Sequence, residues 1–342
     1  MPIARYGENV QTSILSTGSY LPQSVVTNED LARVLDTSDE WIWSHIGIRE
    51  RRIAREEQTS DLAERAARRA LAGTIGTQDL DGIIVATQTP DKPVPATACI
   101  LQHKLSAPNC FAFDINAACS GFVYALHLAT GLIRSSLARR ILVVGAERMS
   151  RLVDWRDRRT CVIFSDGAGA LVLGGTEERE PRLADLLDTI VFNDGTGEEV
   201  IHVPLGGSSN PITAETVDSN LRYVQMDGRR VFTFARNAFV ETVRALSERN
   251  RVPVVELAHI IPHQANMRII EAAMSDLALP ITRAVTHLAR YGNTCAASIP
   301  IALDEEAREG RFATGESIAL VAFGTGLSWG GALLRWRAQA YQ

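Results

Sequence analysis

Lysine is almost absent from this chain: Lys92 and Lys104 are the only two, and arginine supplies the rest of the 35 basic side chains. No Gly-Lys-Ser/Thr sequence occurs, which excludes a Walker A nucleotide-binding loop. Neither lysine stands in a context typical of a Schiff-base enzyme, which requires a desolvated amine. Because the net charge is −5, no basic surface for nucleic acid is expected.

Cysteine and long apolar runs are also scarce. The five cysteines are odd in number and include no Cys-x-x-Cys pair, which argues against a disulfide framework and a structural zinc site. No apolar run approaches the ~20 residues of a membrane span, and the first 19 residues lack the features of a signal peptide. We therefore expect a cytoplasmic protein with no membrane partner and no bound metal.

Short apolar runs alternate with amphipathic stretches along the chain. Strands are predicted at 82–86, 140–145 and 317–323, and helices at 60–71, 119–136, 231–249 and 267–277. This alternation predicts an α/β fold.

The two halves of the chain are arranged alike. Each carries a long helix, a strand and then a Gly-rich turn into another apolar strand, at 166–173 and at 324–334. Such self-similarity indicates an internal duplication, which we divide into halves 1–180 and 181–342 with the charged segment 177–181 as the junction. A Rossmann fingerprint is rejected because too little chain follows Gly326 for a βαβ unit.

Cys119 stands in a setting that favours reactivity. A strand-like run ends at Asn116, and small residues then lead through Cys119 into an amphipathic helix. Backbone N–H groups and the positive end of the helix dipole favour a thiolate at this position. On the residues alone, a small buried core cysteine is an equal alternative. That is the interpretation we prefer for the other four: Cys99, Cys110, Cys161 and Cys295.

Two polar residues in the second half are candidate partners. Pro262 interrupts a strand-like run and places His263 at the start of a helix, where α/β folds present functional groups. The same proline argues against a metal-binding helix that would pair His263 with His259. Asn293 lies in a turn before a small-residue helix and offers a donor suited to an oxyanion. Taken alone, a histidine like His263 is more often a capped loop residue than a catalytic one, and a turn or N-cap residue is a good explanation for Asn293.

The ordered set of these segments resembles a known family. Asn116-Ala-Ala-Cys-Ser-Gly-Phe, Pro262-His-Gln-Ala-Asn and Tyr291-Gly-Asn-Thr are similar, in order and spacing, to β-ketoacyl-acyl carrier protein synthase III. Five further segments extend the resemblance over nearly the whole chain: Gly18-Ser-Tyr-Leu-Pro, Thr37-Ser-Asp-Glu-Trp-Ile, Gly47-Ile-Arg-Glu-Arg, Phe164-Ser-Asp-Gly-Ala-Gly-Ala and Phe323-Gly-Thr-Gly-Leu-Ser-Trp-Gly. The resemblance implies a thiolase-like fold, in which duplicated halves pack as αβαβα layers, and a homodimer.

The family's reaction is a decarboxylative Claisen condensation in fatty acid biosynthesis. The resemblance implies that Cys119 attacks an acyl-CoA and carries the acyl group until malonyl-acyl carrier protein enters. His263 and Asn293 would then stabilise the enolate left by loss of CO2, at ~3 kcal/mol for each donor. The oxyanion hole for the thioester would combine the backbone N–H of Cys119 with the active-site loop Phe323, Gly324, Thr325 and Gly326. No cofactor is implied beyond acyl-CoA as a substrate.

The implied CoA site and acyl pocket depart from the family pattern. Trp41 matches a residue that stacks on adenine and Arg158 matches a second CoA contact, but His45 replaces the usual arginine. A neutral imidazole lacks the fixed charge and the planar fork of donors, so weaker CoA binding is expected. Val94 replaces a phenylalanine of acetyl-selective members, which predicts a primer longer than acetyl.

A basic docking surface for the acidic carrier protein is also implied. Arg268 matches a docking residue of the family, whereas Thr233 stands where a lysine is usual. Three nearby arginines are equally well explained as solvated helix residues: Arg229, Arg230 and Arg236.

Two other enzymatic functions and one non-enzymatic function compete with the synthase. A relative from secondary metabolism would keep the nucleophile but transfer the acyl group to another acceptor, and the substitutions at His45 and Val94 favour it. A degradative thiolase would carry a second cysteine in the C-terminal Gly-rich loop, where none occurs. A non-catalytic subunit would have lost the nucleophile, which is present.

Overall fold

The computed structural model describes residues 11–175 and 182–337. Strands in these ranges are β1 (Thr12–Tyr20), β2 (Val25–Thr27), β3 (Glu50–Arg52), β4 (Gly82–Ala86), β5 (Phe111–Ile115), β6 (Arg140–Arg148), β7 (Asp166–Gly175), β8 (Ala184–Asn193), β9 (Ile201–His202), β10 (Gln225–Met226), β11 (Leu257–Pro262), β12 (Ser317–Gly324) and β13 (Ser328–Trp336). The helices are α1 (Asn28–Ala32), α2 (Asp39–Ile46), α3 (Thr59–Leu71), α4 (Thr97–Leu105), α5 (Gly121–Arg134), α6 (Gly228–Asn250), α7 (Met267–Asp276), α8 (Leu288–Tyr291) and α9 (Ser298–Arg308).

The strand directions repeat between the two halves. The main sheet has the order β11-β12-β13-β8-β1-β7-β6-β4-β5. In the first half β4 and β6 are parallel while β6, β7 and β1 are antiparallel neighbours. In the second half β11 and β12 are parallel while β12, β13 and β8 are antiparallel neighbours. The predicted duplication is therefore visible in the strand order.

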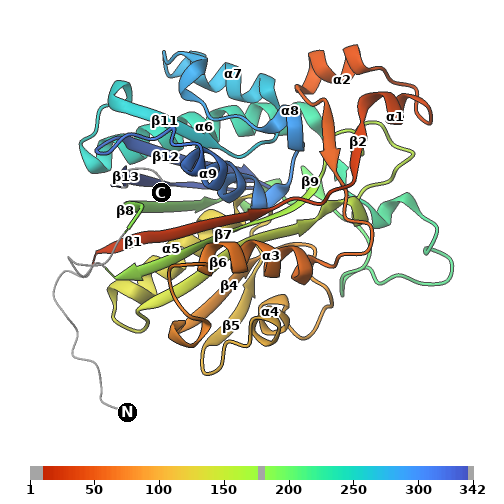
Figure 1. Cartoon of the computed structure of the whole chain (residues 1–342). Coiled ribbons are helices and arrows are strands. Elements are labelled where there is room, and N and C mark those ends of the chain that lie inside the picture. The colour runs from red at the N-terminus through yellow and green to blue at the C-terminus, as the bar shows by residue number, and fades with distance from the viewer. Residues whose placement is uncertain (1–10, 176–181, 338–342) are drawn as a thin grey trace.

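Three hydrophobic clusters show the layers. One cluster joins α5 and α9 to strands of both halves, so these two helices lie between the half-sheets. A second cluster covers the outside of the first half with α3 and α4, and a third covers the second half with α6 and α7. The half-sheets meet where Thr12–Ile14 of β1 pairs with β8. The αβαβα arrangement predicted from the sequence is confirmed (Figure 1).

Close backbone packing holds the outer and central layers. The alanine-rich face of α3 lies so near β1 that a Cβ at Gly18 would come within 2.4 Å of the Ala66 carbonyl oxygen. A Cβ at Gly145 of β6 would likewise come within 2.4 Å of the Ala296 carbonyl oxygen. Glycine at these positions therefore lets helical segments approach the strands more closely than any other residue allows.

The predicted elements agree with the observed ones except beside His263. All three predicted strands and all four predicted helices are present within a few residues of their expected bounds. Pro262 is the last residue of β11, and α7 begins at Met267, so the expected helix start at His263 is wrong. Asn266 caps α7 by accepting from the Arg268 amide, which leaves residues 263–266 as a turn. The predicted junction at 177–181 lies outside the described residues.

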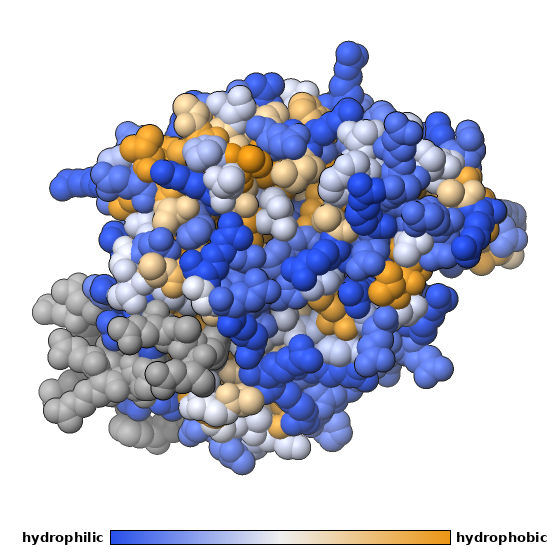
Figure 2. Space-filling view, turned by 45° about the horizontal axis from the view of Figure 1, so that its top comes forward, coloured by the Kyte–Doolittle hydropathy of each residue, from blue (hydrophilic) through white to orange (hydrophobic). Residues whose placement is uncertain are grey.

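The surface shows no feature of a membrane span. Among the described helices, none combines the length and the apolar composition needed to cross a bilayer. The face seen in Figure 2 is largely hydrophilic, with hydrophobic residues interspersed among polar ones.

Candidate active site

Cys119 lies in a 3-10 turn, Ala118–Ser120, that leads directly into α5. Ala118 adopts a left-handed conformation with φ of 45°, and its amide donates to the Oδ1 atom of Asn116 at 3.2 Å. This sharp turn places the sulfur at the N-terminal end of α5, as predicted, where the helix dipole favours a thiolate. Gly324 packs against it, because a Cβ there would be 2.7 Å from the Cβ of Cys119.

The second half contains an equivalent turn before α9. Asn293 Oδ1 accepts from the Cys295 amide at 2.8 Å, and Cys295 has a left-handed φ of 51°. The 3-10 turn Cys295–Ala297 then leads into α9. Because its Oδ1 is held by this bond, the Asn293 side chain turns its NH2 group toward the cavity. Asn293 and Asn116 therefore occupy equivalent positions in the duplicated halves.

His263 is fixed by three contacts at the end of β11. Its backbone N–H donates to the Val321 carbonyl at 2.7 Å, and its Nδ1 lies 2.8 Å from the Oγ of Ser298. The same Oγ accepts the Gln264 amide at 3.4 Å, so the Ser298 proton is available to Nδ1. This arrangement favours the tautomer that carries its hydrogen on Nε2. The Phe323 ring packs edge-on against the imidazole, with ring centroids 5.4 Å apart.

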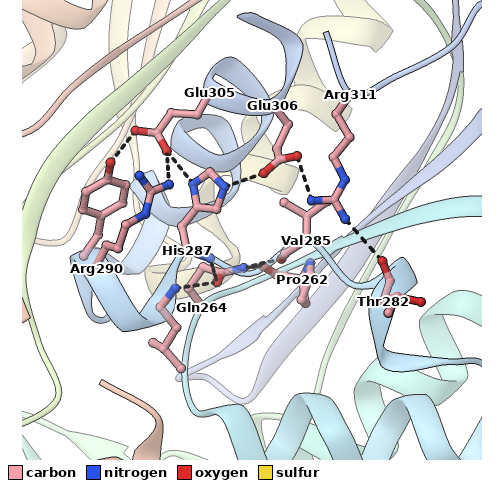
Figure 3. Close-up of polar contacts among 11 residues, drawn as sticks. Pro262, Gln264, Thr282, Val285, His287, Arg290, Glu305, Glu306 and Arg311 are labelled. Atoms are coloured by element: carbon pink, nitrogen blue, oxygen red, sulfur yellow. Dashed lines mark hydrogen bonds and ion pairs between the residues drawn. The ribbon is translucent and has the colours of Figure 1, made fainter. Parts of the chain in front are cut away.

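Gln264 holds the turn that follows the catalytic histidine (Figure 3). Its Nε2 donates to the carbonyls of Pro262 and Val285, and its Oε1 accepts the backbone N–H of His287 at 2.9 Å. Because Gln264 is buried and fully engaged, the turn has little freedom to move. The neighbouring His263 side chain is thereby kept in one orientation.

His287 anchors the same region to α9. Its ring nitrogens lie 2.8 Å from Glu305 and 2.7 Å from Glu306 (Figure 3). Burial lowers the pKa of His287, but hydrogen bonds and charge from the two glutamates outweigh it and raise this pKa above the usual value. Arg311 adds an ion pair with Glu306 at 2.9 Å. A buried imidazolium flanked by two carboxylates therefore ties the turn before α8 to the central layer.

One cavity of about 200 Å³ brings the predicted catalytic residues together. Cys119, His263 and Asn293 all line it, as do three residues of the predicted active-site loop: Phe323, Gly324 and Thr325. His263 and Asn293 are nearly inaccessible, with 1% and 4% of their surfaces exposed. Gly326 follows in the same loop and adopts a positive φ of 139°. The cavity thus brings the Cys119 thiol together with the side chains of His263 and Asn293, which are largely shielded from water.

The strongest influence on the Cys119 thiol comes from Cys295, a residue that the sequence did not identify. The Cys295 thiol donates to Cys119 across 3.3 Å between the sulfurs. This hydrogen bond and a further one from His263 lower the pKa of Cys119 well below its ordinary value despite burial. Burial and the neighbouring Cys119 raise the pKa of Cys295 well above normal. The proton therefore belongs to Cys295 and the thiolate to Cys119.

Cys295 and Glu147 are functional candidates that sequence reasoning missed. Cys295 is buried in a hydrophobic cluster, as expected of a core cysteine, but its sulfur also contacts the sulfur of Cys119. Glu147 lies beneath the site and accepts from Thr87, Gln88 and Thr89. Burial raises the pKa of Glu147 to about 8. The shared spacing of Asn116-Ala-Ala118 and Asn293-Thr-Cys295 was the available sequence signal for Cys295.

The residues expected at the CoA end lie together. His45 stacks on Trp41 with ring centroids 4.5 Å apart, and the Arg158 guanidinium lies 5.2 Å from the Trp41 ring. Arg268 is exposed and donates through Nε to the Ser44 carbonyl at 2.9 Å. Asn266 donates to the His45 carbonyl at 3.1 Å. The end of α2 is thus tied to the turn that follows His263.

Val94 is not part of the cavity formed by this chain. It lies on the loop between β4 and α4 and is 79% exposed.

Thr233 is on α6, whose N-terminal residues Gly228 and Val231 line the cavity. Arg236 is engaged by Asp276 at 2.6 Å.

No group of three His, Cys, Asp or Glu side chains within 11–175 and 182–337 is arranged to hold a metal ion. His259, the alternative metal ligand, lies 3.4 Å from Glu316 and packs against Phe312. His259 and His263 thus have separate surroundings.

Comparison with known proteins places this geometry in a family. The chain matches the family model of 3-oxoacyl-[acyl-carrier-protein (ACP)] synthase III over residues 113–195 and that of its C-terminal part over residues 247–336. A β-ketoacyl-[acyl-carrier-protein] synthase III from Caldanaerobacter subterraneus subsp. tengcongensis is 46% identical, covering 96% of this chain and 99% of its own.

Comparison with solved structures leads to the same family. The synthase III from Aquifex aeolicus VF5 is 44% identical with a TM-score of 0.87, covering 95% of this chain and 100% of its own. The priming β-ketosynthase of the R1128 polyketide pathway is 34% identical, also with a TM-score of 0.87, covering 99% of this chain and 100% of its own. The chain belongs to the β-ketoacyl-[acyl-carrier-protein] synthase III family of condensing acyltransferases.

Proposed function

We propose that this chain condenses an acyl-CoA primer with malonyl-acyl carrier protein, using Cys119 as nucleophile and His263 and Asn293 as donors to the enolate. The observation that carries the proposal is the convergence of these three side chains on one cavity. The hydrogen bond from Cys295 to the Cys119 sulfur adds to it, because a donor to the sulfur favours its thiolate form. The named relatives support this choice of substrates.

In the first half-reaction, Cys119 attacks the thioester carbonyl. The carbonyl oxygen becomes an oxyanion that backbone N–H groups at Cys119 and the neighbouring Gly324 loop stabilise. CoA leaves as its thiolate and the acyl group stays on the sulfur. Gly324 is required here because any side chain would occupy the space against Cys119.

In the second half-reaction, the malonyl thioester loses CO2 and leaves an enolate. The Nε2 hydrogen of His263 and the amide of Asn293 donate to the enolate oxygen, so no general base is needed. The enolate carbon attacks the acyl-enzyme carbonyl, and the Cys119 thiolate departs to regenerate the enzyme. Ser298 matters because its contact with Nδ1 keeps the hydrogen on the nitrogen that faces the cavity.

The proposed primer is longer than acetyl. Apolar side chains line the cavity near the sulfur, including Met149, Ile163 and Val224. Val94 is exposed in the single chain, and the proposal includes a homodimer in which it reaches the partner's pocket. A valine there leaves more room than a phenylalanine would.

The proposal also assigns the binding of CoA and of the carrier protein. Trp41, His45 and Arg158 would bind the CoA end, and Arg268 would guide the acidic carrier protein. Arg268 supports this role because it is exposed beside α2. Arg229 and Arg230 are exposed and directly follow the cavity-lining Gly228 in the sequence.

Intact-mass measurement tests the function. Wild type and Cys119→Ala are incubated with a panel of acyl-CoAs, and malonyl-acyl carrier protein is then added. We expect a thioester adduct on wild type only, and its discharge to a β-ketoacyl product with release of CO2. If Cys119→Ala loads equally well, the nucleophile is wrong. If acetyl-CoA has by far the highest kcat/KM, the primer assignment is wrong.

A second candidate is starter-unit transfer in secondary metabolism. The likeness to the R1128 priming ketosynthase and the substitution at His45 favour it. In that case the thioester would form in the same assay, but malonyl-acyl carrier protein would leave it in place. An alcohol, an amine or another carrier would then discharge it.

A further inference from the structure

A second thiol lies behind the nucleophile, and the proposed reaction gives it no bond to make or break. The sulfurs of Cys119 and Cys295 are 3.3 Å apart although 176 residues separate them in the sequence. Each is carried by a short 3-10 turn at the start of a helix of the central layer. A disulfide requires ~2.05 Å between sulfurs, so the two sulfurs must come about 1.2 Å closer to bond.

The two thiols differ in access from solution. Cys119 lines the cavity and is partly exposed to it, whereas Cys295 is fully buried at 0% and is not part of the lining. Gln88 covers Cys295 from the cavity side and donates to its sulfur at 3.0 Å. A small oxidant that enters the cavity therefore meets Cys119 first and Cys295 only through it.

The two thiols also differ in reactivity. The thiolate form of a cysteine reacts with peroxides, and a second thiol beside it resolves the product. Hydrogen bonding from Cys295 lowers the pKa of Cys119, while Cys295 keeps its proton. This is the arrangement of an attacking thiolate backed by a resolving thiol.

We propose that Cys119 and Cys295 form a reversible disulfide when the unacylated enzyme meets a peroxide, so that Cys295 is a redox modification site of this enzyme. The Cys119 thiolate takes a hydroxyl group from hydrogen peroxide and becomes a sulfenic acid, while the O–O bond breaks and the hydroxide released takes a proton from solvent to become water. The Cys295 sulfur then attacks the Cys119 sulfur, forming the S–S bond, while its proton and the sulfenic oxygen leave as a second water. A dithiol reductant restores both thiols by exchange and is itself oxidised to a disulfide.

Two consequences follow for the enzyme. While the disulfide is present the nucleophile is blocked, so acyl loading stops. The same bond protects Cys119 from oxidation to sulfinic acid, which dithiols do not reverse. An acyl group on Cys119 occupies the sulfur, so loaded enzyme resists the oxidant.

The test compares wild type, Cys295→Ser and Cys99→Ser after hydrogen peroxide, with thiols then blocked by iodoacetamide. Serine at 295 keeps a hydroxyl donor but cannot form the cross-link, and Cys99 is a partly exposed cysteine outside the site. Non-reducing peptide mapping of wild type and Cys99→Ser is expected to show a peptide joining Cys119 to Cys295, with an intact mass lower by two hydrogen atoms. Dithiothreitol should restore acyl loading of wild type and Cys99→Ser almost completely, measured against the untreated form of each protein.

Cys295→Ser should show no such peptide and should accumulate sulfinic acid at Cys119, with more than ~90% of loading lost for good after prolonged exposure. The proposal is overturned if wild type forms no Cys119–Cys295 peptide. It is also overturned if dithiothreitol rescues Cys295→Ser as fully as wild type. Peptide mapping needs no acyl donor, so this result is independent of whether the proposed condensation is correct.

Discussion

The Oγ of Ser298 lies 2.8 Å from the Nδ1 of His263, so the first residue of α9 sets the hydrogen position of a residue 35 places earlier. Ser298→Ala removes this contact, which is worth ~1 kcal/mol. We expect the condensation rate to fall about fivefold while acyl loading on Cys119 is nearly unchanged, measured by single-turnover kinetics. Ser298→Thr keeps the hydroxyl and should recover most of the rate. Equal losses in loading and condensation would contradict a role through the imidazole.

Removing either enolate donor should separate the two half-reactions. His263→Ala and Asn293→Ala should each lower condensation by about 10²–10³-fold, the usual effect of losing one oxyanion donor. Loading should persist, although His263→Ala should also slow it, because His263 contributes to the low pKa of Cys119. Rapid-quench measurement of each step checks this. If Asn293→Ala blocks loading more than condensation, its assigned role is incorrect.

Glu147 should make the folded protein less stable as pH rises. Burial raises its folded pKa to about 8 from an ordinary value of 4.5, so the folded state prefers the neutral carboxyl. Its contribution is fully present below the unfolded pKa and is lost between about 4.5 and about 8. Glu147→Gln should flatten this part of the Tm-against-pH curve. An unchanged slope between pH 5 and about 8 would show that Glu147 is not the group responsible.

His287 should also stabilise the fold in a pH-dependent way. Glu305 and Glu306 raise its pKa above 6.5, so its contribution is fully present below the unfolded pKa and is lost as pH rises through the folded value. His287→Gln should therefore lower Tm more at pH 6 than at pH 9, by ~2–4 °C per kcal/mol lost. Scanning calorimetry at the two pH values measures the difference. His103→Gln, which changes a histidine outside this network, serves as the matched control.

His45 should limit CoA affinity. The imidazole stacks on Trp41 within the chain, and it lacks the permanent charge of a guanidinium. His45→Arg should lower KM for acyl-CoA several-fold with little change in kcat, and the gain should shrink at high salt. Steady-state kinetics at two ionic strengths test this. A KM that does not respond would mean that CoA binds elsewhere.

Much of the fold could be predicted from continuous apolar runs. β4 and β12 are buried on both faces, and strands of this kind are recognisable by composition alone. β1 was not among the predicted strands because polar residues fill its buried positions. Ser16 donates to the Ala70 carbonyl, while Thr17 and Ser19 both donate to Asp304. Because these hydrogen-bond partners lie far apart in the sequence, they leave no local pattern of residues that would predict the strand.

The candidate site also combines residues with a local sequence signal and contacts that have none. Cys119 and Asn293 each stand at a turn that small residues and asparagine predict, so their placement could be inferred. The contact of Cys295 with Cys119 depends on how the two halves dock, which periodicity does not reveal. The roles of Val94 and Arg268 stay predictions, since one needs a partner chain and the other needs a carrier protein.

The position of α5 and α9 back to back inside the molecule has a practical meaning for engineering. In the proposed reaction, α5 follows the attacking sulfur and α9 follows the amide that would stabilise the enolate, so a shift of one helix relative to the other would change the reaction geometry. The outer helices α3 and α4 contribute no residue to the lining of the cavity. Stabilising substitutions belong on those outer helices, while the buried contact between the two inner helices is best left intact.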